Sequence, residues 1–199
     1  GRVLSALDRM GLRENTLIVY TSDHGEFAGE HGLIEKAPGI GFHCVTRIPM
    51  IWSWPGHLPE GESRRALVES IDFLPTICRL ADLTAPDCLD GTDIGGLLEN
   101  DTPVRKFAFT ENHLSKTIQS DRYKLTRYLP EMNDGNSHGE LFDHKTDPWE
   151  LNNRYTDPEL ATVRAELESE LVDWIIRTTR ARTINPRTPA SAPGGARAW

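Results

Sequence analysis

The sequence is poor in cysteine. It contains three, at Cys44, Cys78 and Cys88, and their spacing matches neither a metal-binding nor a redox motif. This argues against cysteine-based metal or redox chemistry, and we expect buried or incidental thiols. So small a set leaves the cellular compartment open.

Long apolar runs are missing as well. No stretch of the sequence is long enough to cross a lipid bilayer, so we expect no membrane span. The start of the chain shows no secretory signal. Because the chain opens with Gly1-Arg2-Val3 and not with methionine, we expect a true N-terminus upstream.

Positive charge is in deficit. The 22 Lys and Arg residues face 30 Asp and Glu residues, which gives a net charge of -8. This argues against nucleic acid or an anionic membrane as a partner, because both favour basic surfaces. A local basic pocket for an anionic substrate remains compatible with it. The 199 residues, 38% hydrophobic and 26% charged, suffice for a globular domain with a core.

Apolar patterning predicts α/β structure in residues 1–100. One helical face runs over Arg2–Met10, and Gly11 suits the left-handed conformation at a helix C-terminus. The continuous apolar runs at Thr16–Thr21 and Pro49–Trp54 suit strands buried on both faces, as in a parallel sheet. Ser70–Leu83 has the spacing of a further helix. We interpret residues 1–100 as part of an α/β domain.

The pattern changes after about Pro86. Short β-like segments separated by polar turns predict a small antiparallel sheet, with strands at Lys106–Thr110, Lys116–Gln119, Tyr123–Tyr128 and Glu140–Phe142. An apolar helical stripe from Pro158 to about Arg180 should pack on that sheet. Residues 101–182 would thus form a subdomain. The tail, residues 183–199, is rich in Pro, Ala, Gly and Arg and is predicted to be disordered.

Two candidate metal ligands directly follow the first predicted strand. Asp23 and His24 lie where ligands gather in open α/β sheets, beyond the carboxyl end of a strand. A carboxylate next to an imidazole can offer two ligands to one metal from one turn. Aspartate oxygen suits calcium, magnesium or manganese, and histidine also admits zinc. The alternative is that Asp23 caps a turn and His24 is solvated, and the dipeptide alone does not decide.

The residues around this pair extend the pattern. The run from Thr21 to Leu33 reads Thr-Ser-Asp-His-Gly-Glu-Phe-Ala-Gly-Glu-His-Gly-Leu, and Lys36 follows shortly after. It closely resembles the sulfatases of the alkaline phosphatase superfamily, including the related phosphonate and phosphate ester hydrolases. The resemblance continues in order through Arg47-Ile48-Pro49-Met50-Ile51, Pro55-Gly56, Ile71–Thr76, Asp90-Gly91, Asp121–Leu125, Glu140–Asp143 and Asp147-Pro148-Trp149-Glu150.

The resemblance implies a fold and a set of site residues. The fold would be the C-terminal part of an alkaline-phosphatase-like α/β sandwich, plus a small antiparallel sheet packed by a C-terminal helix. Asp23 and His24 match two ligands of the active-site metal, usually calcium, with manganese, magnesium and zinc as alternatives. Lys36 matches the lysine that contacts the sulfate ester, where a cation offsets the charge that builds as the bond breaks. His31 lies within the motif as a structural or substrate-proximal residue. Independently of the resemblance, Glu111, Asn112 and His113 follow a predicted strand and could reach the substrate rim.

Other parts of the family pattern are missing. The nucleophile, a cysteine or serine oxidised to formylglycine in a Cys/Ser-x-Pro-x-Arg motif, does not occur, and neither do the family's first acidic ligands. We expect the last two fifths or so of a typical member, inactive and a weak metal binder alone. Its exposed strand edges should favour self-association or an N-terminal partner chain.

Three functions are compatible with this sequence. The first is part of a hydrolase acting on small sulfate esters. The second is a phosphodiesterase or phosphonate monoester hydrolase, which shares the Asp-His pair and the lysine. The third is a non-catalytic interaction module.

Overall fold

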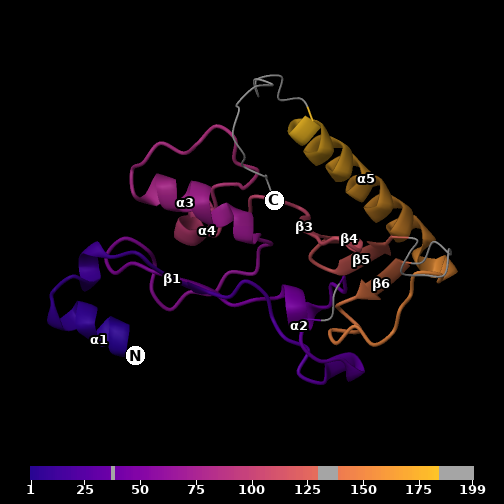
Figure 1. The fold of residues 1–199 in the computed structure, drawn as a ribbon, viewed down its shortest axis with the longest axis horizontal. Coiled ribbons are helices and arrows are strands. Elements are labelled where there is room, and N and C mark those ends of the chain that lie inside the picture. Colours follow the sequence, from indigo (N-terminus) through magenta and orange to yellow (C-terminus); the bar gives the residue numbers. More distant parts are fainter. Residues whose placement is uncertain (37–38, 130–138, 184–199) are drawn as a thin grey trace, which may run out of the picture.

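The computed structural model describes residues 1–36, 39–129 and 139–183. Figure 1 shows a smaller two-stranded sheet with α1, α3 and α4 around it, and a four-stranded sheet crossed by the long helix α5. The helices are α1 (Arg2–Arg9), α2 (His43–Thr46), α3 (Phe73–Leu80), α4 (Gly95–Asn100) and α5 (Ala161–Thr183). The strands are β1 (Ile18–Thr21), β2 (Met50–Ser53), β3 (Ala108–Glu111), β4 (Ser115–Gln119), β5 (Tyr123–Tyr128) and β6 (Gly139–Asp143). Short 3-10 turns are η1 (Arg13–Asn15), η2 (Glu30–Gly32), η3 (Ser70–Asp72) and η5 (Pro158–Leu160).

The four-stranded sheet confirms the predicted antiparallel sheet and its covering helix. The strands pair in the order β3-β4-β5-β6, each antiparallel to the next. The register places Ile118 opposite Leu125, and Leu125 opposite Leu141, so these buried side chains share one face. Leu167 and Leu171 of α5 join them in one core. Burying each such side chain contributes about 1.5–3 kcal/mol, so this core holds α5 to the sheet.

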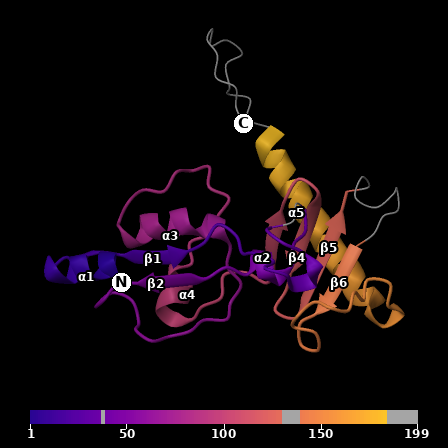
Figure 2. The ribbon, with the colours of Figure 1, turned by 60° about the horizontal axis from the view of Figure 1, so that its bottom comes forward.

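The opposite face of this sheet carries the segment that leads to the site. Thr117 and Thr126 pair across β4 and β5, with their hydroxyl oxygens 2.9 Å apart. Phe142 of β6 contacts the ring of Phe42, just before α2, with the centroids 5.6 Å apart. Figure 2 shows α2 between the two sheets. The four-stranded sheet is therefore packed by α5 on one face and by the chain around α2 on the other.

The smaller sheet corrects the expectation of a parallel sheet buried on both faces. β1 and β2 pair antiparallel, with Val19 opposite Trp52 and Tyr20 opposite Ile51. Trp52 packs on Phe73 of α3, with ring centroids 5.6 Å apart. Tyr20 and Ile51 are 62% and 57% exposed. An apolar run reports how much apolar surface a strand carries but not the direction of its partner, so the pattern could not distinguish the two pairings.

The two helices predicted within residues 1–100 are confirmed with shorter bounds. Gly11 has φ 64°, as expected after α1. The helix predicted from Ser70 begins as η3 and continues as α3, behind a capping box formed by Glu69 and Asp72. Asp72 is buried, and Arg105 Nη2 donates to its Oδ1 at 2.7 Å, which ties this helix to the start of the second half.

The division into residues 1–100 and 101–182 stays a prediction. Residues 184–199 of the tail predicted to be disordered lie outside the described residues. Among the helices of the described part, none combines the length and apolar character that crossing a membrane would need.

Candidate functional site

A single large groove brings together four of the five residues predicted from the sequence. Its volume is about 1760 Å³, and Asp23, His24, Lys36 and His113 all line it. Further polar lining comes from His43, Arg47, Gln119 and His144. Four of the predicted site residues therefore line one space, although they come from distant parts of the chain.

Asp23 and His24 place two potential metal-binding atoms close together. Asp23 Oδ2 lies 3.6 Å from His24 Nε2, and the two side chains are 84% and 39% exposed. His24 Nδ1 lies 2.8 Å from the carbonyl oxygen of Gly25, so we assign the ring proton to Nδ1. Such a hydrogen bond fixes the tautomer of a metal-binding histidine and leaves Nε2 with its lone pair. Both facing atoms can therefore donate electron pairs.

The carboxyl group of Asp23 is held in its ionised form. Its Oδ1 accepts a hydrogen bond from the backbone N–H of His24 at 2.9 Å. That backbone donor, followed by the nearby imidazole, keeps the pKa of Asp23 below its ordinary value. An ionised carboxylate is the form that a hard divalent cation binds.

Gly25 fixes the turn that carries the pair. Its N–H donates to the carbonyl of Val45 at 2.8 Å, and the N–H of Glu26 donates to the carbonyl of Cys44 at 3.0 Å. A Cβ at position 25 would lie 1.9 Å from the carbonyl oxygen of Cys44. Only glycine allows this approach, so the turn after β1 is docked against α2 by a residue without a side chain.

Lys36 and His113 are exposed and lie on two segments that are joined to each other. Gly39, shortly after Lys36, has φ 85°, and a Cβ there would lie 2.5 Å from Leu114 Cβ. The hydroxyl of Ser115 donates to the carbonyl of Gly39 at 2.7 Å. The chain after the lysine thus rests on the turn between β3 and β4 that carries His113.

His31 lies apart from the groove lining. Its ring stacks on Phe42 with centroids 3.9 Å apart and an interplanar angle of 15°. Its backbone is left-handed, with φ 53°. This placement agrees with the structural alternative for His31, and a contact with substrate stays a prediction.

One buried carboxylate behind the groove was missed by sequence reasoning. Glu150 is 2% exposed. Its Oε1 accepts from Lys124 Nζ at 2.9 Å and lies 2.8 Å from His144 Nε2. Its Oε2 accepts from the backbone N–H of His43 at 2.8 Å. The rings of His43 and His144, both on the groove lining, are 4.0 Å apart. Glu150 therefore positions part of the groove wall.

The charges of this cluster follow from its burial and its contacts. Burial raises the pKa of Glu150, but the hydrogen bond from His144 and the Lys124 ammonium outweigh it and bring the pKa to about 2. Burial of the His43 imidazole, reinforced by Lys124, lowers its pKa to about 4. At neutral pH Glu150 is thus ionised and His43 is neutral.

The sequence contained one indication of the cluster around Glu150, which is the run Asp147-Pro148-Trp149-Glu150. It could not supply the partners, because Lys124 and His43 lie 26 and 107 residues from Glu150. No periodicity links positions so far apart.

Comparison with known proteins identifies the family. The family model for N-sulphoglucosamine sulphohydrolase, C-terminal, matches residues 29–177, more than half of the chain. The chain belongs to the sulfatase family. The resemblance read from the motifs is thereby confirmed.

Two curated sulfatases show how much of the family the chain covers. The N-acetylglucosamine-6-O-sulfatase of Bacteroides thetaiotaomicron is 32% identical over 180 residues, which are 84% of this chain and 31% of that protein. The uncharacterized sulfatase YidJ of Escherichia coli is 35% identical over 185 residues, 88% of this chain and 35% of that protein. The chain therefore spans about a third of the length of these relatives.

Solved structures share the fold. One, in complex with its substrate D-glucosamine-2-N,6-O-disulfate, has a TM-score of 0.80 and 29% identity, and the match covers 94% of this chain and 38% of that one. The phosphonate monoester hydrolase of Agrobacterium radiobacter has a TM-score of 0.75 and 26% identity over 89% of this chain and 38% of that one. Chemistry on sulfur and on phosphorus thus occurs within this fold.

The donor atoms of Asp23 and His24 are of the kind that binds a divalent metal. Sulfatases typically use a calcium ion. Asp23 Oδ2 and His24 Nε2 lie 3.6 Å apart. Because the hydrogen bond of the His24 ring is made by Nδ1, the lone pair of Nε2 stays available for a metal. Within the described ranges, this pair belongs to no group of three or more candidate ligands. The two residues suit a divalent metal in their chemistry but supply only some of its ligands.

Proposed function

We propose that the groove is part of the active site of a sulfatase that cleaves sulfuric esters with a divalent metal. The observation that supports this most directly is the 3.6 Å separation of Asp23 Oδ2 and His24 Nε2 on the wall of the groove. In the sulfatase family, Asp23 and His24 match the positions of two ligands of the active-site metal. Calcium is the expected ion.

Each groove residue has a role in this proposal. Asp23 and His24 bind the ion, which supplies Lewis-acid stabilisation of the ester group when bound. Lys36 places its ammonium near the ester oxygens and offsets the charge that develops as the bond breaks. His113, exposed on the turn after β3, contacts the rim of the substrate. His43 and His144 form the wall behind them and are oriented by Glu150.

A sulfated sugar is the substrate class that the groove favours. Its volume of about 1760 Å³ exceeds that of typical small-molecule sites, which are roughly 300–1000 Å³, so a sugar ring with its sulfate groups would fit. A structurally similar protein was solved with D-glucosamine-2-N,6-O-disulfate as its substrate. We therefore expect sulfated monosaccharides to occupy this groove in preference to small alkyl sulfates.

The 199 residues should not hydrolyse a sulfate ester without further residues. The sequence contains no Cys/Ser-x-Pro-x-Arg nucleophile motif. We expect no release of aryl alcohol from an aryl sulfate above the rate with heat-denatured chain. Metal-dependent turnover by the purified chain would contradict this expectation.

Metal binding at the pair can be tested by NMR with Mn²⁺. Addition of Mn²⁺ should broaden the backbone signals of residues 22–26 selectively, and Ca²⁺ should compete for the same position. Asp23→Ala should abolish the broadening. Asp121→Ala, which removes another exposed groove carboxylate, is the matched control and should leave it unchanged. Equal broadening in wild type and Asp23→Ala would argue against the site.

A phosphorus ester is the second candidate, favoured by the structural match to a phosphonate monoester hydrolase. The metal-loaded chain can be titrated with methyl sulfate and with methylphosphonate while the His24 and His113 signals are followed. The sulfatase proposal predicts that methyl sulfate shifts these signals at the lower concentration. The reverse order would favour the phosphorus chemistry.

A further inference from the structure

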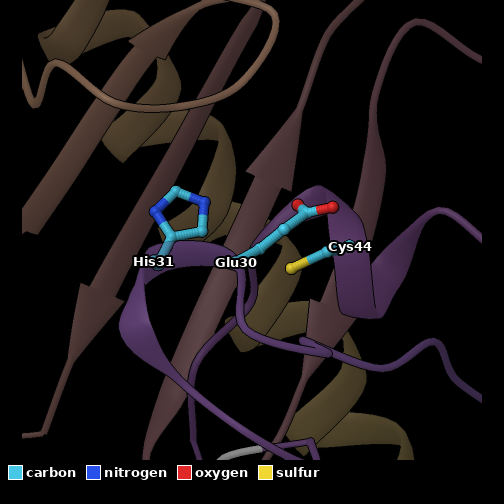
Figure 3. A group of neighbouring side chains, drawn as sticks. All are labelled: Glu30, His31 and Cys44. Carbon is cyan, nitrogen blue, oxygen red and sulfur yellow. The ribbon is translucent and has the colours of Figure 1, made fainter.

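A second set of candidate ligands lies outside the groove lining, between η2 and α2. Glu30 and His31 belong to η2, and Cys44 belongs to α2. The carboxylate, imidazole and thiol ligand atoms all lie within 4.8 Å of one another. Figure 3 shows the three side chains as neighbours, with the carboxylate of Glu30 above the sulfur of Cys44 and the ring of His31 to one side.

The backbone holds η2 and α2 together at this point. Gly29 N–H donates to the carbonyl of Leu33 at 2.9 Å, which closes the turn around Glu30 and His31. Glu26 N–H donates to the carbonyl of Cys44 at 3.0 Å, which joins this loop to α2. The fold of the loop thus places the backbones of Glu30, His31 and Cys44 close enough for their side chains to meet.

His31 is oriented by its neighbours. Its ring stacks on Phe42, and Phe27 lies at its edge with centroids 6.3 Å apart. Throughout residues 1–36, 39–129 and 139–183, no hydrogen bond is formed by the His31 ring or the Glu30 carboxylate. Stacking therefore fixes the imidazole plane while both groups keep electron pairs for a ligand.

The charges around Cys44 favour a cation. Burial raises the pKa of the Cys44 thiol, and the carboxylates of Glu30 and Glu150 raise it further. A bound divalent cation would reverse this effect, since metal coordination deprotonates a thiol. The negative surroundings that keep the thiol protonated are thus the surroundings that attract a metal.

The other trio with metal-ligand spacing, His43, His144 and Glu150, lacks this property. The ammonium of Lys124 lies 2.9 Å from Glu150 Oε1 and already neutralises the carboxylate. A dication there would be placed beside a buried ammonium. Of the two trios, only the one at η2 has, within the described residues, no ion pair between a ligand and a lysine or arginine. The charge of Lys124 also acts on Cys44, but its effect on the thiol is smaller than that of Glu30 and Glu150.

We propose that Glu30, His31 and Cys44 form a zinc-class metal site that braces the loop between β1 and α2. Thiolate, imidazole and carboxylate are all ligands of Zn²⁺, and three protein ligands leave a fourth position for water. Calcium does not suit this site, because it takes six to eight oxygen ligands. On binding, a bond forms between the metal and the Cys44 sulfur, and the thiol proton passes to solvent.

Titration of the reduced full chain with Co²⁺ tests this site. Co²⁺ replaces Zn²⁺ in such sites, and its bond to a thiolate gives a charge-transfer absorption band. We expect the band to saturate at one equivalent of Co²⁺ and to disappear when Zn²⁺ is added. Cys44→Ser should abolish it and His31→Asn should weaken Co²⁺ binding at least tenfold. Absence of the band in the wild-type chain would overturn the proposal.

A matched control uses the exposed cysteine at position 88. Cys88→Ser removes a thiol far from η2 in the sequence and should leave the band unchanged. Alkylation followed by mass spectrometry gives a second measurement that does not depend on the stability of a variant. Zn²⁺ should slow the modification of Cys44 at least tenfold and leave that of Cys88 unchanged. Equal protection of both cysteines, or a band that survives Cys44→Ser, would contradict the assignment.

The test of the Glu30, His31 and Cys44 site can be distinguished from the test of the Asp23 and His24 site. Asp23→Ala should keep the cobalt band while losing the Mn²⁺ broadening of residues 22–26. Cys44→Ser should do the reverse. Loss of both signals in Cys44→Ser with an unchanged far-UV circular dichroism spectrum would show one shared site and refute two separate ones.

Discussion

At the scale of single residues, the wall of the groove depends on a buried carboxylate. Glu150 combines a left-handed backbone, with φ 57°, with hydrogen bonds from Lys124, from the backbone of His43 and with the ring of His144. Asp23 and His24 are different, because they are adjacent in the sequence and their hydrogen bonds lie within one turn. Local contacts are encoded by adjacent residues, whereas the contacts of Glu150 are brought about by the tertiary fold.

Removal of the Glu150 charge should destabilise the fold strongly. Glu150→Gln keeps the shape but leaves the Lys124 ammonium, 1% exposed, without its ionic partner. Breaking a buried ion pair in this way costs about 3–5 kcal/mol of the free energy of unfolding. Glu111→Gln is the matched control, since Glu111 and Lys116 form a more exposed pair at 3.0 Å and such pairs contribute about 0–1 kcal/mol. Urea denaturation measures both values, and equal losses would refute the role of burial.

The same carboxylate predicts a dependence of stability on pH. The pKa of Glu150 is about 2 in the folded chain, against an ordinary value of 4.5. A lowered folded pKa gives stability that is present above the ordinary value and is lost as the pH falls through the folded one. The difference in free energy of unfolding between wild type and Glu150→Gln should therefore shrink by roughly 3 kcal/mol between about pH 4.5 and pH 2. A difference that stays constant across this range would contradict the assigned contacts.

At the scale of elements, a helix or strand could be predicted from the sequence when it was long enough to show a pattern and when that pattern lay within a single segment. The strand at Tyr123–Tyr128 was predicted with its observed bounds, because polar turn residues, including Ser120-Asp121, separate it from the neighbouring strands. The helices α2 and α4, with four and six residues, were missed since a helix that short shows no 3.6-residue period. The antiparallel pairing of β1 with β2 was also missed, because pairing is a property of two segments and not of either one.

The docking of the turn after β1 on α2 gives a prediction at this scale. Gly25→Ala would place a methyl group 1.9 Å from the carbonyl oxygen of Cys44, so the turn must move away from α2. We expect a loss of about 1–3 kcal/mol in the free energy of unfolding and loss of the Mn²⁺ broadening at Asp23. Gly96→Ala is the control, because a Cβ there meets only Thr102 at 3.8 Å within a helix. That variant should be neutral or more stable by about 0.5–1 kcal/mol, by thermal denaturation.

At the scale of the whole molecule, the two sheets are covered unequally. The four-stranded sheet is packed on both faces, by α5 and by the chain around α2. The two-stranded sheet packs through Trp52 on α3 and carries the cross-strand pair of Tyr20 and Ile51 on exposed surface. The relatives are about three times as long as the segment that this chain matches.

An exposed apolar sheet surface should drive association of the isolated chain. Tyr20 and Ile51 lie opposite each other in the β1–β2 register, so they form one continuous patch that association would remove from water. Sedimentation velocity should show a concentration-dependent shift to larger species for the wild-type chain. Ile51→Lys should raise the concentration needed for that shift at least tenfold, because it places a charge in the centre of the patch. Val172→Lys, at a 53% exposed position on α5, adds the same charge elsewhere and should leave the shift unchanged. A shift that responds equally to both substitutions would mean that net charge, and not this face, controls association.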